Sequence, residues 1–281
     1  MDAAEMNAVV TAISSRISKC TIPFCYPKID RYITASAVVI EIQDRLFGFT
    51  CNHTLPDHAS NVWIISVNSV SADNYTENEI VKGIWKSKTH WPDAGVIEFH
   101  NDKAREFLHP NLEPLTIGDI SRDVEVSRMA VVSGFPSEMV DVQKEDTGKQ
   151  GKKVMATFNG VTSPAKPIEV ESWPEGDSTA PETNPAIDIF LPYKKGEVVN
   201  AQMGRLNAEN FEHAQAHPEG LSGGGIWQAE AYTGGVWTTG LRLVGIQCRS
   251  VASEYLRGIR MQPVLELLGS IDNDLKEQIG I

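Results

Sequence analysis

The sequence predicts an all-β protein made of antiparallel barrels or sandwiches, with one helix before and one helix after the β-rich region. Short runs of β-branched and aromatic residues follow one another through most of the chain, and turn residues separate most of them. Helical spacing of apolar residues occurs near the two ends. Because almost no helix is expected between the strands, the pattern favours sheets packed on each other over an alternating α/β architecture.

The two helices are expected at 5–17 and 263–268. In the first, Met6, Val9, Ile13 and Ile17 recur at the spacing of one helix face, so this helix is expected to pack on the β-region. The second begins with Pro263 in its first turn, where the missing N–H costs no hydrogen bond.

Short strands with turn residues between them account for the rest of the pattern. They are expected at 37–42, 46–50, 62–67, 93–99, 124–133, 154–160, 187–191, 225–229 and 241–248. The segment Gln43-Asp44-Arg45 is expected to join the first two as a hairpin. Polar composition predicts exposed loops at 140–153 and 163–185.

The composition is that of a globular protein. Its 281 residues, of which 41% are hydrophobic, suffice for a substantial core. With 25 basic and 37 acidic residues the formal charge is −12, the wrong sign for nucleic acid or anionic lipid, so neither nucleic acid nor a membrane is expected as a partner. The acidic N-terminus is unlike a signal peptide, and the four cysteines lack a disulfide-framework pattern. We therefore expect a cytoplasmic protein with reduced thiols.

One serine lies in a glycine-rich turn directly before an expected strand. Ser222 is preceded by Gly220 and followed by Gly223-Gly224-Gly225. Glycine at position 220 permits a backbone that aims its N–H and that of Ser222 at one point, and the lack of side chains lets a carbonyl group approach. Alone, this segment predicts no more than a glycine-rich turn.

A histidine and an aspartate at strand ends complete a set that is typical of nucleophilic catalysis. His53 follows the strand at 46–50, and Asp93 begins the strand at 93–99. Amide hydrolysis through a covalent intermediate needs a hydroxyl nucleophile, a base, a carboxylate that orients the base, and donors for the oxyanion. The ordered set of His53, Asp93 and Ser222 supplies the first three.

These segments resemble the motifs of the trypsin-like serine peptidase family, over roughly 33–268. Gly48-Phe49-Thr50-Cys51-Asn52-His53 resembles its G-x-x-T-A-A-H motif, Asp93-Ala94-Gly95-Val96 its D-I-A-L motif, and Gly220-Leu221-Ser222-Gly223-Gly224 its G-D-S-G-G motif. Gly134-Phe135-Pro136 is similar to a turn common in bacterial members, so the resemblance is to an intracellular member of bacterial type.

The resemblance implies two antiparallel β-barrels of the chymotrypsin type, with an N-terminal helical extension at 1–32, a first barrel at 33–118, and a second barrel with long loops and the C-terminal helix at 119–281. It implies a serine endopeptidase that acts on proteins or peptides and needs no cofactor. In this role His53 is the general base, Asp93 holds its tautomer, Ser222 attacks, and the amides of Gly220 and Ser222 form the oxyanion hole.

The chain departs from the family motifs at two places. Cys51 and Asn52 replace two alanines, so the packing behind the imidazole is expected to differ. Leu221 replaces the aspartate with which secreted members bind a new N-terminal amine. Activity is therefore expected to be controlled by loop order or by a regulatory protein partner.

The resemblance also implies a substrate pocket. Ala216 stands where trypsin has an aspartate, so a buried cationic side chain would have no partner there. His217 and the segment Cys248-Arg249-Ser250 are implied as further pocket residues. We expect cleavage at small or medium uncharged residues, with Arg249 favouring acidic groups nearby.

The main alternative is a catalytically silent trypsin-like module that binds peptides or a partner protein, since a fold does not fix a function. An α/β-hydrolase is disfavoured because no histidine follows Ser222. No metal site is expected, because His213 and His217 lack a third ligand and Cys20 and Cys25 lack a second pair. The segment 146–153 lacks the glycine and the Ser/Thr of a phosphate-binding loop.

Overall fold

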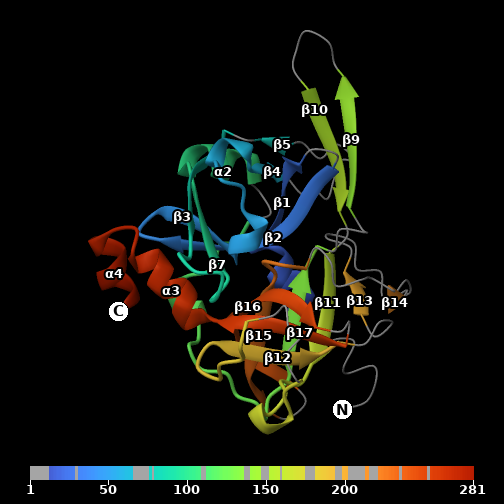
Figure 1. The fold of residues 1–281 in the computed structure, drawn as a ribbon, viewed down its shortest axis with the longest axis vertical. Coiled ribbons are helices and arrows are strands. Elements are labelled where there is room, and N and C mark those ends of the chain that lie inside the picture. Colours follow the sequence, from blue (N-terminus) through green and yellow to red (C-terminus); the bar gives the residue numbers. More distant parts are fainter. Residues whose placement is uncertain are drawn as a thin grey trace.

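The structure is a computed structural model that describes residues 13–28, 31–65, 76–77, 79–108, 112–135, 140–146, 152–158, 160–174, 181–193, 198–201, 213–214, 221–233, 236–251 and 254–281. The chain forms two β-rich halves, and helices from its C-terminal end lie beside them (Figure 1). The expected fold class, antiparallel β with helices near both ends, is confirmed.

The first half is a seven-stranded antiparallel sheet in the order β5-β4-β1-β2-β3-β7-β6. The hairpin between β2 and β3 turns at Gln43 and Asp44, whose φ angles are 50° and 60°. Positive φ at both central residues matches the twist of the adjoining strands, and the predicted hairpin is confirmed. The strands are β1 (Thr21–Lys28), β2 (Arg31–Ile42), β3 (Arg45–Cys51), β4 (Trp63–Ile65), β5 (Thr76–Glu77), β6 (Val81–Lys86) and β7 (Ala94–Phe99).

Strand β1 lies within the segment 1–32, for which the sequence predicted a helical extension. Residues 13–18 are helical, but the chain then extends and β1 pairs with β2 on one side and with β4 on the other. Pro23 and Pro27 explain the change, because a proline within a helix removes a hydrogen bond and clashes with the preceding turn. The first sheet therefore begins before residue 33.

The second half is an eight-stranded antiparallel sheet in the order β12-β17-β16-β15-β8-β11-β13-β14. Its strands are β8 (Ala130–Gly134), β11 (Gly160–Ala165), β12 (Asp188–Pro192), β13 (Val198–Ala201), β14 (His213–Ala214), β15 (Gly225–Thr233), β16 (Val236–Val251) and β17 (Tyr255–Arg260). Strand β15 directly follows the serine turn, and β16 returns beside it.

A separate hairpin replaces the loop predicted at 140–153. Strands β9 (Val140–Asp146) and β10 (Lys152–Phe158) pair with each other and project from the body of the molecule (Figure 1). The prediction was wrong here because a polar composition indicates solvent exposure without excluding strand pairing.

Three α-helices are described in full: α2 (Asn101–Leu108), α3 (Met261–Gly269) and α4 (Asn273–Ile279). Helix α3 confirms the expected C-terminal helix, whereas α2 and α4 were not predicted. Short 3₁₀ turns occur at η1 (Asn52–Thr54), η2 (Ala59–Asn61), η3 (Ile117–Asp119) and η6 (Val170–Ser172). Within the described part of the chain, no helix combines the length and apolar character that a membrane span requires.

The largest hydrophobic cluster lies where the two halves meet. It joins residues of β2, β3 and β7 to residues of β15, β16 and helices α3 and α4. Phe49 and Cys51 of the first half, and Trp227, Ile246 and Cys248 of the second, are all buried in it. Burial of apolar surface thus fixes the ends of β3 and β16 against each other, next to the predicted site.

Candidate active site

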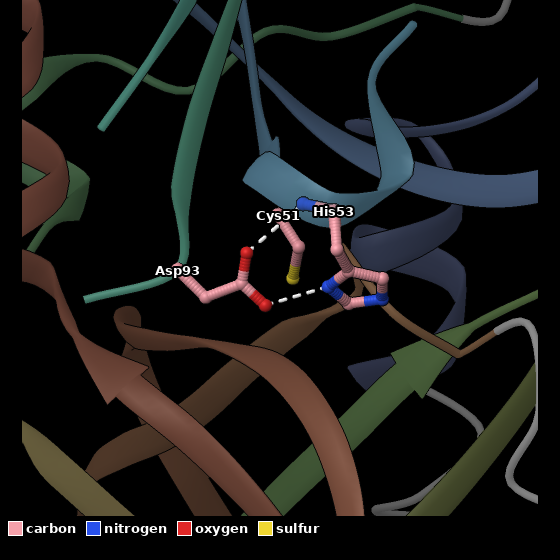
Figure 2. Close-up of side chains that lie close together, drawn as sticks. All are labelled: Cys51, His53 and Asp93. Atoms are coloured by element: carbon pink, nitrogen blue, oxygen red, sulfur yellow. Dashed lines mark hydrogen bonds and ion pairs between the residues drawn. The ribbon is translucent and has the colours of Figure 1, made fainter. Parts of the chain in front are cut away.

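His53 and Asp93 come from neighbouring strands of the first sheet. His53 lies in η1, directly after β3, and Asp93 immediately precedes β7. Because β3 and β7 are antiparallel and Cys51 pairs with Ala94, the end of one strand meets the beginning of the other. The topology therefore brings together two residues that are 40 positions apart in sequence (Figure 2).

Two hydrogen bonds hold the histidine to the aspartate. The Nδ1 atom of His53 lies 2.5 Å from Oδ2 of Asp93, and the His53 backbone N–H donates to Oδ1 at 2.9 Å. A carboxylate accepts hydrogen bonds, so this contact suits the tautomer in which Nδ1 carries the proton and Nε2 has a free lone pair. The side chain of Asp93 is 2% exposed and that of His53 is 44% exposed, so the base faces solvent while its orienting group is buried.

The serine turn is fixed by backbone contacts to both halves. The Ser222 carbonyl accepts the N–H of Ser36 in β2 at 3.0 Å, and the N–H of Gly223 donates to the Gln247 carbonyl at 2.8 Å. Gly223 has a φ of +89°, and a Cβ added there would lie 1.9 Å from the Ser36 carbonyl oxygen. Only glycine fits this turn.

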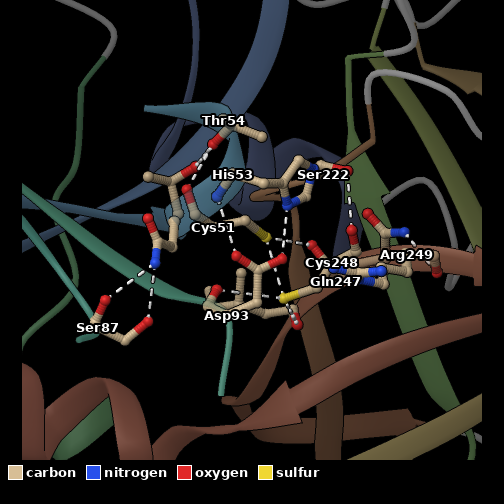
Figure 3. Close-up of polar contacts among 12 residues, drawn as sticks. Cys51, His53, Thr54, Ser87, Asp93, Ser222, Gln247, Cys248 and Arg249 are labelled. Carbon is tan, nitrogen blue, oxygen red and sulfur yellow. Dashed lines mark hydrogen bonds and ion pairs between the residues drawn. The ribbon is translucent and has the colours of Figure 1, made fainter. Parts of the chain in front are cut away.

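The Ser222 hydroxyl donates to the backbone carbonyl of Cys248 at 3.1 Å (Figure 3). Among the described residues this is its hydrogen-bond acceptor, and the hydroxyl is not bonded to His53. In the view of Figure 3, Asp93 and Ser222 flank the imidazole on opposite sides. The backbone N–H of Ser222 donates to no described residue.

The remaining predicted site residues divide into two groups. Cys248, Arg249 and Ser250 lie at the end of β16, beside the serine turn. The Cys248 side chain is buried, Arg249 is partly buried with its Cζ 6.0 Å from the Trp91 ring centre, and Ser250 is exposed. The predicted oxyanion residue and two predicted pocket residues lie outside the described residues: Gly220, Ala216 and His217.

Behind the histidine and aspartate lies a buried pair of thiols that the sequence did not reveal as a pair. The Sγ of Cys51 is 3.0 Å from the Sγ of Cys248, and it also lies 3.1 Å from the Gln247 carbonyl oxygen. Burial raises the pKa of both thiols. The only sign of this pair in the sequence was that Cys51 stands where the family motif has alanine. That replacement did not identify Cys248 as its partner.

A buried ion pair, which sequence reasoning missed, packs against Trp91, two residues before Asp93. The Arg257 guanidinium lies 4.0 Å from the centre of the Trp91 ring and binds the Asp188 carboxylate at 2.8 and 3.1 Å. The side chains of Arg257 and Asp188 are 1% and 0% exposed. A desolvated cation over an indole face is a strong contact, so β17 of the second half supports the Trp91–Asp93 segment of the first.

Cys51, His53 and Asp93 also offer three potential metal-ligand atoms within 4.8 Å of one another (Figure 2). These atoms already have partners: His53 Nδ1 bonds to Asp93, and the Cys51 thiol bonds to Cys248 and Gln247. The elevated pKa of Cys51 also opposes the thiolate that a metal needs. The arrangement is therefore suited to hydrogen bonding and proton transfer.

No protein-family model and no curated protein sequence matches the chain. Among solved structures, an inactivated protease paralogue of the scabies mite matches 92% of this chain and 96% of its own, at 12% identity and a TM-score of 0.54. A serine endoprotease from Yersinia pestis matches 98% of this chain and 68% of its own, at 12% identity and a TM-score of 0.49. The active form of a protease from M. tuberculosis matches 99% of this chain and 87% of its own, at 15% identity and a TM-score of 0.47.

At these sequence identities the likeness concerns the fold alone. It rests on the scabies mite structure, whose TM-score is 0.54. The two antiparallel sheets, the terminal helices and this match agree with one architecture. The chain has the two-barrel trypsin/chymotrypsin fold of serine proteases.

Proposed function

We propose that the protein is a serine endopeptidase that hydrolyses peptide bonds through an acyl-enzyme formed on Ser222. The observation that carries the proposal is the paired hydrogen bonding of His53 to the buried carboxylate of Asp93. A structural histidine needs no buried carboxylate that accepts two hydrogen bonds from it. A general base, in contrast, needs a fixed tautomer and a fixed ring orientation.

In the proposed reaction the Ser222 hydroxyl turns from the Cys248 carbonyl towards Nε2 of His53. The oxygen attacks the substrate carbonyl while Nε2 takes the proton, and Asp93 stabilises the imidazolium that forms. The N–H groups of Ser222 and Gly220 receive the oxyanion. His53 then protonates the leaving amine, which leaves an ester between the substrate and Ser222. Water attacks this ester in the same way, with His53 again as the base, and releases the second product.

The proposed substrate is a protein or peptide with an uncharged residue at the cleaved bond. Ala216 offers no charge for arginine or lysine, and removing a cation from water without a partner costs several kcal/mol. Arg249, beside the serine turn, favours acidic groups near the cleaved bond.

A catalytically silent binding module is the second candidate, and two observations favour it. The Ser222 hydroxyl is bonded to Cys248 instead of His53. The solved structure with a TM-score of 0.54 is described as an inactivated protease paralogue. In this alternative the same surface binds a peptide or a partner protein without cleaving it.

Digestion of a peptide library by the purified chain, with Ser222→Ala as control, distinguishes the two. The endopeptidase predicts internal cuts that Ser222→Ala abolishes, and few cuts after arginine or lysine. Cuts that persist in Ser222→Ala would come from a contaminant. A folded chain that makes no cuts but retains library peptides would favour the binding module.

A further inference from the structure

The thiol pair formed by Cys51 and Cys248 joins the two halves of the molecule. Cys51 ends β3 in the first sheet, and Cys248 lies near the end of β16 in the second. Their side chains are 0% and 1% exposed, and their sulfur atoms are 3.0 Å apart although 197 positions separate them in sequence. Figure 3 shows both sulfur atoms close to the side chains of His53 and Asp93.

Neither thiol has a role in the proposed proton transfers. The single hydrogen of the Cys51 thiol lies within reach of the Cys248 sulfur and of the Gln247 carbonyl, and Cys248 contacts the carbonyl groups of Ile246 and Asp93 at 3.4 and 3.7 Å. A disulfide bond is about 2.05 Å long, so the sulfur atoms need to approach by about 1 Å.

We propose that Cys51 and Cys248 are a redox modification site that a peroxide closes to a disulfide across the two halves. This modification site goes beyond the proposed function. Its expected consequence, control of the reactivity of Ser222, rests on the proposed endopeptidase function. The burial of both sulfur atoms selects a small neutral oxidant such as hydrogen peroxide over a bulky disulfide.

The reaction has two steps and consumes one peroxide. The thiolate of one cysteine attacks a peroxide oxygen, the O–O bond breaks, and hydroxide leaves to become water, which gives a sulfenic acid. The second sulfur attacks the first, the S–O bond breaks and a second water leaves. Both sulfur atoms are thereby oxidised and the peroxide is reduced. Burial raises the pKa of both thiols, and the bond between them adds to the rise for Cys51 and opposes it for Cys248, so we assign the first attack to Cys248.

Both cysteines are close to groups that position the candidate triad. The Cys248 carbonyl accepts the Ser222 hydroxyl, and the Cys51 carbonyl accepts the Thr54 hydroxyl at 2.7 Å, on the other side of His53. We expect closure of the disulfide to displace these carbonyl groups from the positions in which they accept the Ser222 and Thr54 hydroxyls. Since a misplacement of about 1 Å can slow a reaction about a hundredfold, the disulfide should slow the reaction of Ser222 by roughly ten- to a hundredfold.

The test treats the full chain with hydrogen peroxide and locates the product by mass spectrometry without reduction. We expect the loss of two hydrogen atoms in a linked pair of peptides that contain Cys51 and Cys248, and recovery with dithiothreitol. Cys20 and Cys25 are matched controls within the same chain, because both are buried and burial raises the pKa of each to about 12. They should stay reduced.

Two variants separate the site from a general effect of oxidation. Cys51→Ala should lose the linked product, and Cys51→Ser is the second variant if alanine prevents folding. Cys25→Ala should keep the product. A chain that retains both thiols after treatment, or that links other cysteines instead, overturns the proposal.

The rate of fluorophosphonate labelling of Ser222, before and after oxidation, tests the consequence for the site. A fall that dithiothreitol reverses, and that Cys51→Ala lacks, supports control by this pair. A disulfide with an unchanged labelling rate overturns that control. If the disulfide forms in a chain that the probe never labels, the modification site is supported and the proposed function is contradicted. Failure of the modification site and failure of the proposed function are therefore distinguishable.

Discussion

The backbone N–H and the imidazole of His53 bind the two oxygens of a single carboxylate, that of Asp93. Because the two donors belong to one residue, the carboxylate fixes both the position of η1 and the orientation of the ring. Asn52 adds a third link, since its backbone N–H donates to the Asp93 carbonyl at 3.1 Å. This arrangement makes Asp93 the residue on which the geometry of the base depends.

Asp93→Asn should lower kcat/KM for the best-cleaved library peptide by about 10⁴-fold, because an amide no longer fixes the proton on Nδ1 of His53. Asp57→Asn is the matched control, since the Asp57 side chain is 94% exposed and pairs only with the ammonium of Lys86 at 3.3 Å. Steady-state kinetics measure both. Near-normal activity in Asp93→Asn would show that the carboxylate has no part in the reaction.

Gly223→Ala should destabilise the protein by about 2–5 kcal/mol, through the positive φ and the clash with the Ser36 carbonyl. Gly280→Ala is the matched control, because Gly280 has a φ of +68° and nothing within 4 Å of an added Cβ. It should cost only about 1 kcal/mol. Chemical denaturation measures both, and equal losses would mean that the serine turn is not packed against Ser36.

Asp188→Asn should lower the free energy of unfolding by about 3–5 kcal/mol, because it leaves the buried Arg257 guanidinium without its counter-charge. Lys103→Met removes the exposed ion pair with Glu79 on the surface and should leave the denaturation midpoint unchanged. If both variants had the same midpoint as the wild type, the buried pair would not stabilise the protein.

Asp272→Asn probes the pH dependence of stability. The hydrogen bond from Arg45 holds the pKa of Asp272 below its ordinary value, so its contribution is present above the ordinary pKa and is lost as pH falls through the folded-state pKa. Asparagine also caps helices, so the variant keeps the cap of α4 and removes the charge. Because the Arg45 and Asp272 side chains are 28% and 36% exposed, solvent screens the pair in part, and the difference should be about 1 kcal/mol or less near pH 7.

That difference between wild type and Asp272→Asn should shrink as the pH falls below about 4. Denaturation curves at several pH values measure it. A difference that grows towards acid pH would contradict the assignment of the lowered pKa to the bond with Arg45.

Runs of β-branched and aromatic residues predicted the strands, because strand propensity is a local property. The two-barrel arrangement and the pairing of His53 with Asp93 were implied by the resemblance to the trypsin-like family, and the pairing of β3 with β7 brings the two residues together. The strand at Thr21–Lys28 was missed because 1–32 was interpreted as a helical extension ahead of the first barrel, and the β9–β10 hairpin because its polar residues were interpreted as a loop.

The sequence did not predict the contacts between the two halves. Cys51 with Cys248, and Trp91 with Arg257, join residues far apart in the chain, and no local pattern identifies such partners. They arise only after both sheets have formed and packed. The polar partner of Ser222 was likewise missed, because the resemblance implied a bond to His53 and the hydroxyl is bonded to Cys248.

Labelling with a fluorophosphonate probe is the direct test of whether His53 and Asp93 activate Ser222 as a nucleophile. The purified chain is treated with the probe, digested, and analysed by mass spectrometry, with Ser222→Ala and His53→Ala in parallel. We expect a single adduct on Ser222 in the wild type, none in Ser222→Ala, and greatly slowed labelling in His53→Ala. A folded wild-type chain that acquires no adduct, or one whose adduct persists in Ser222→Ala, would contradict it.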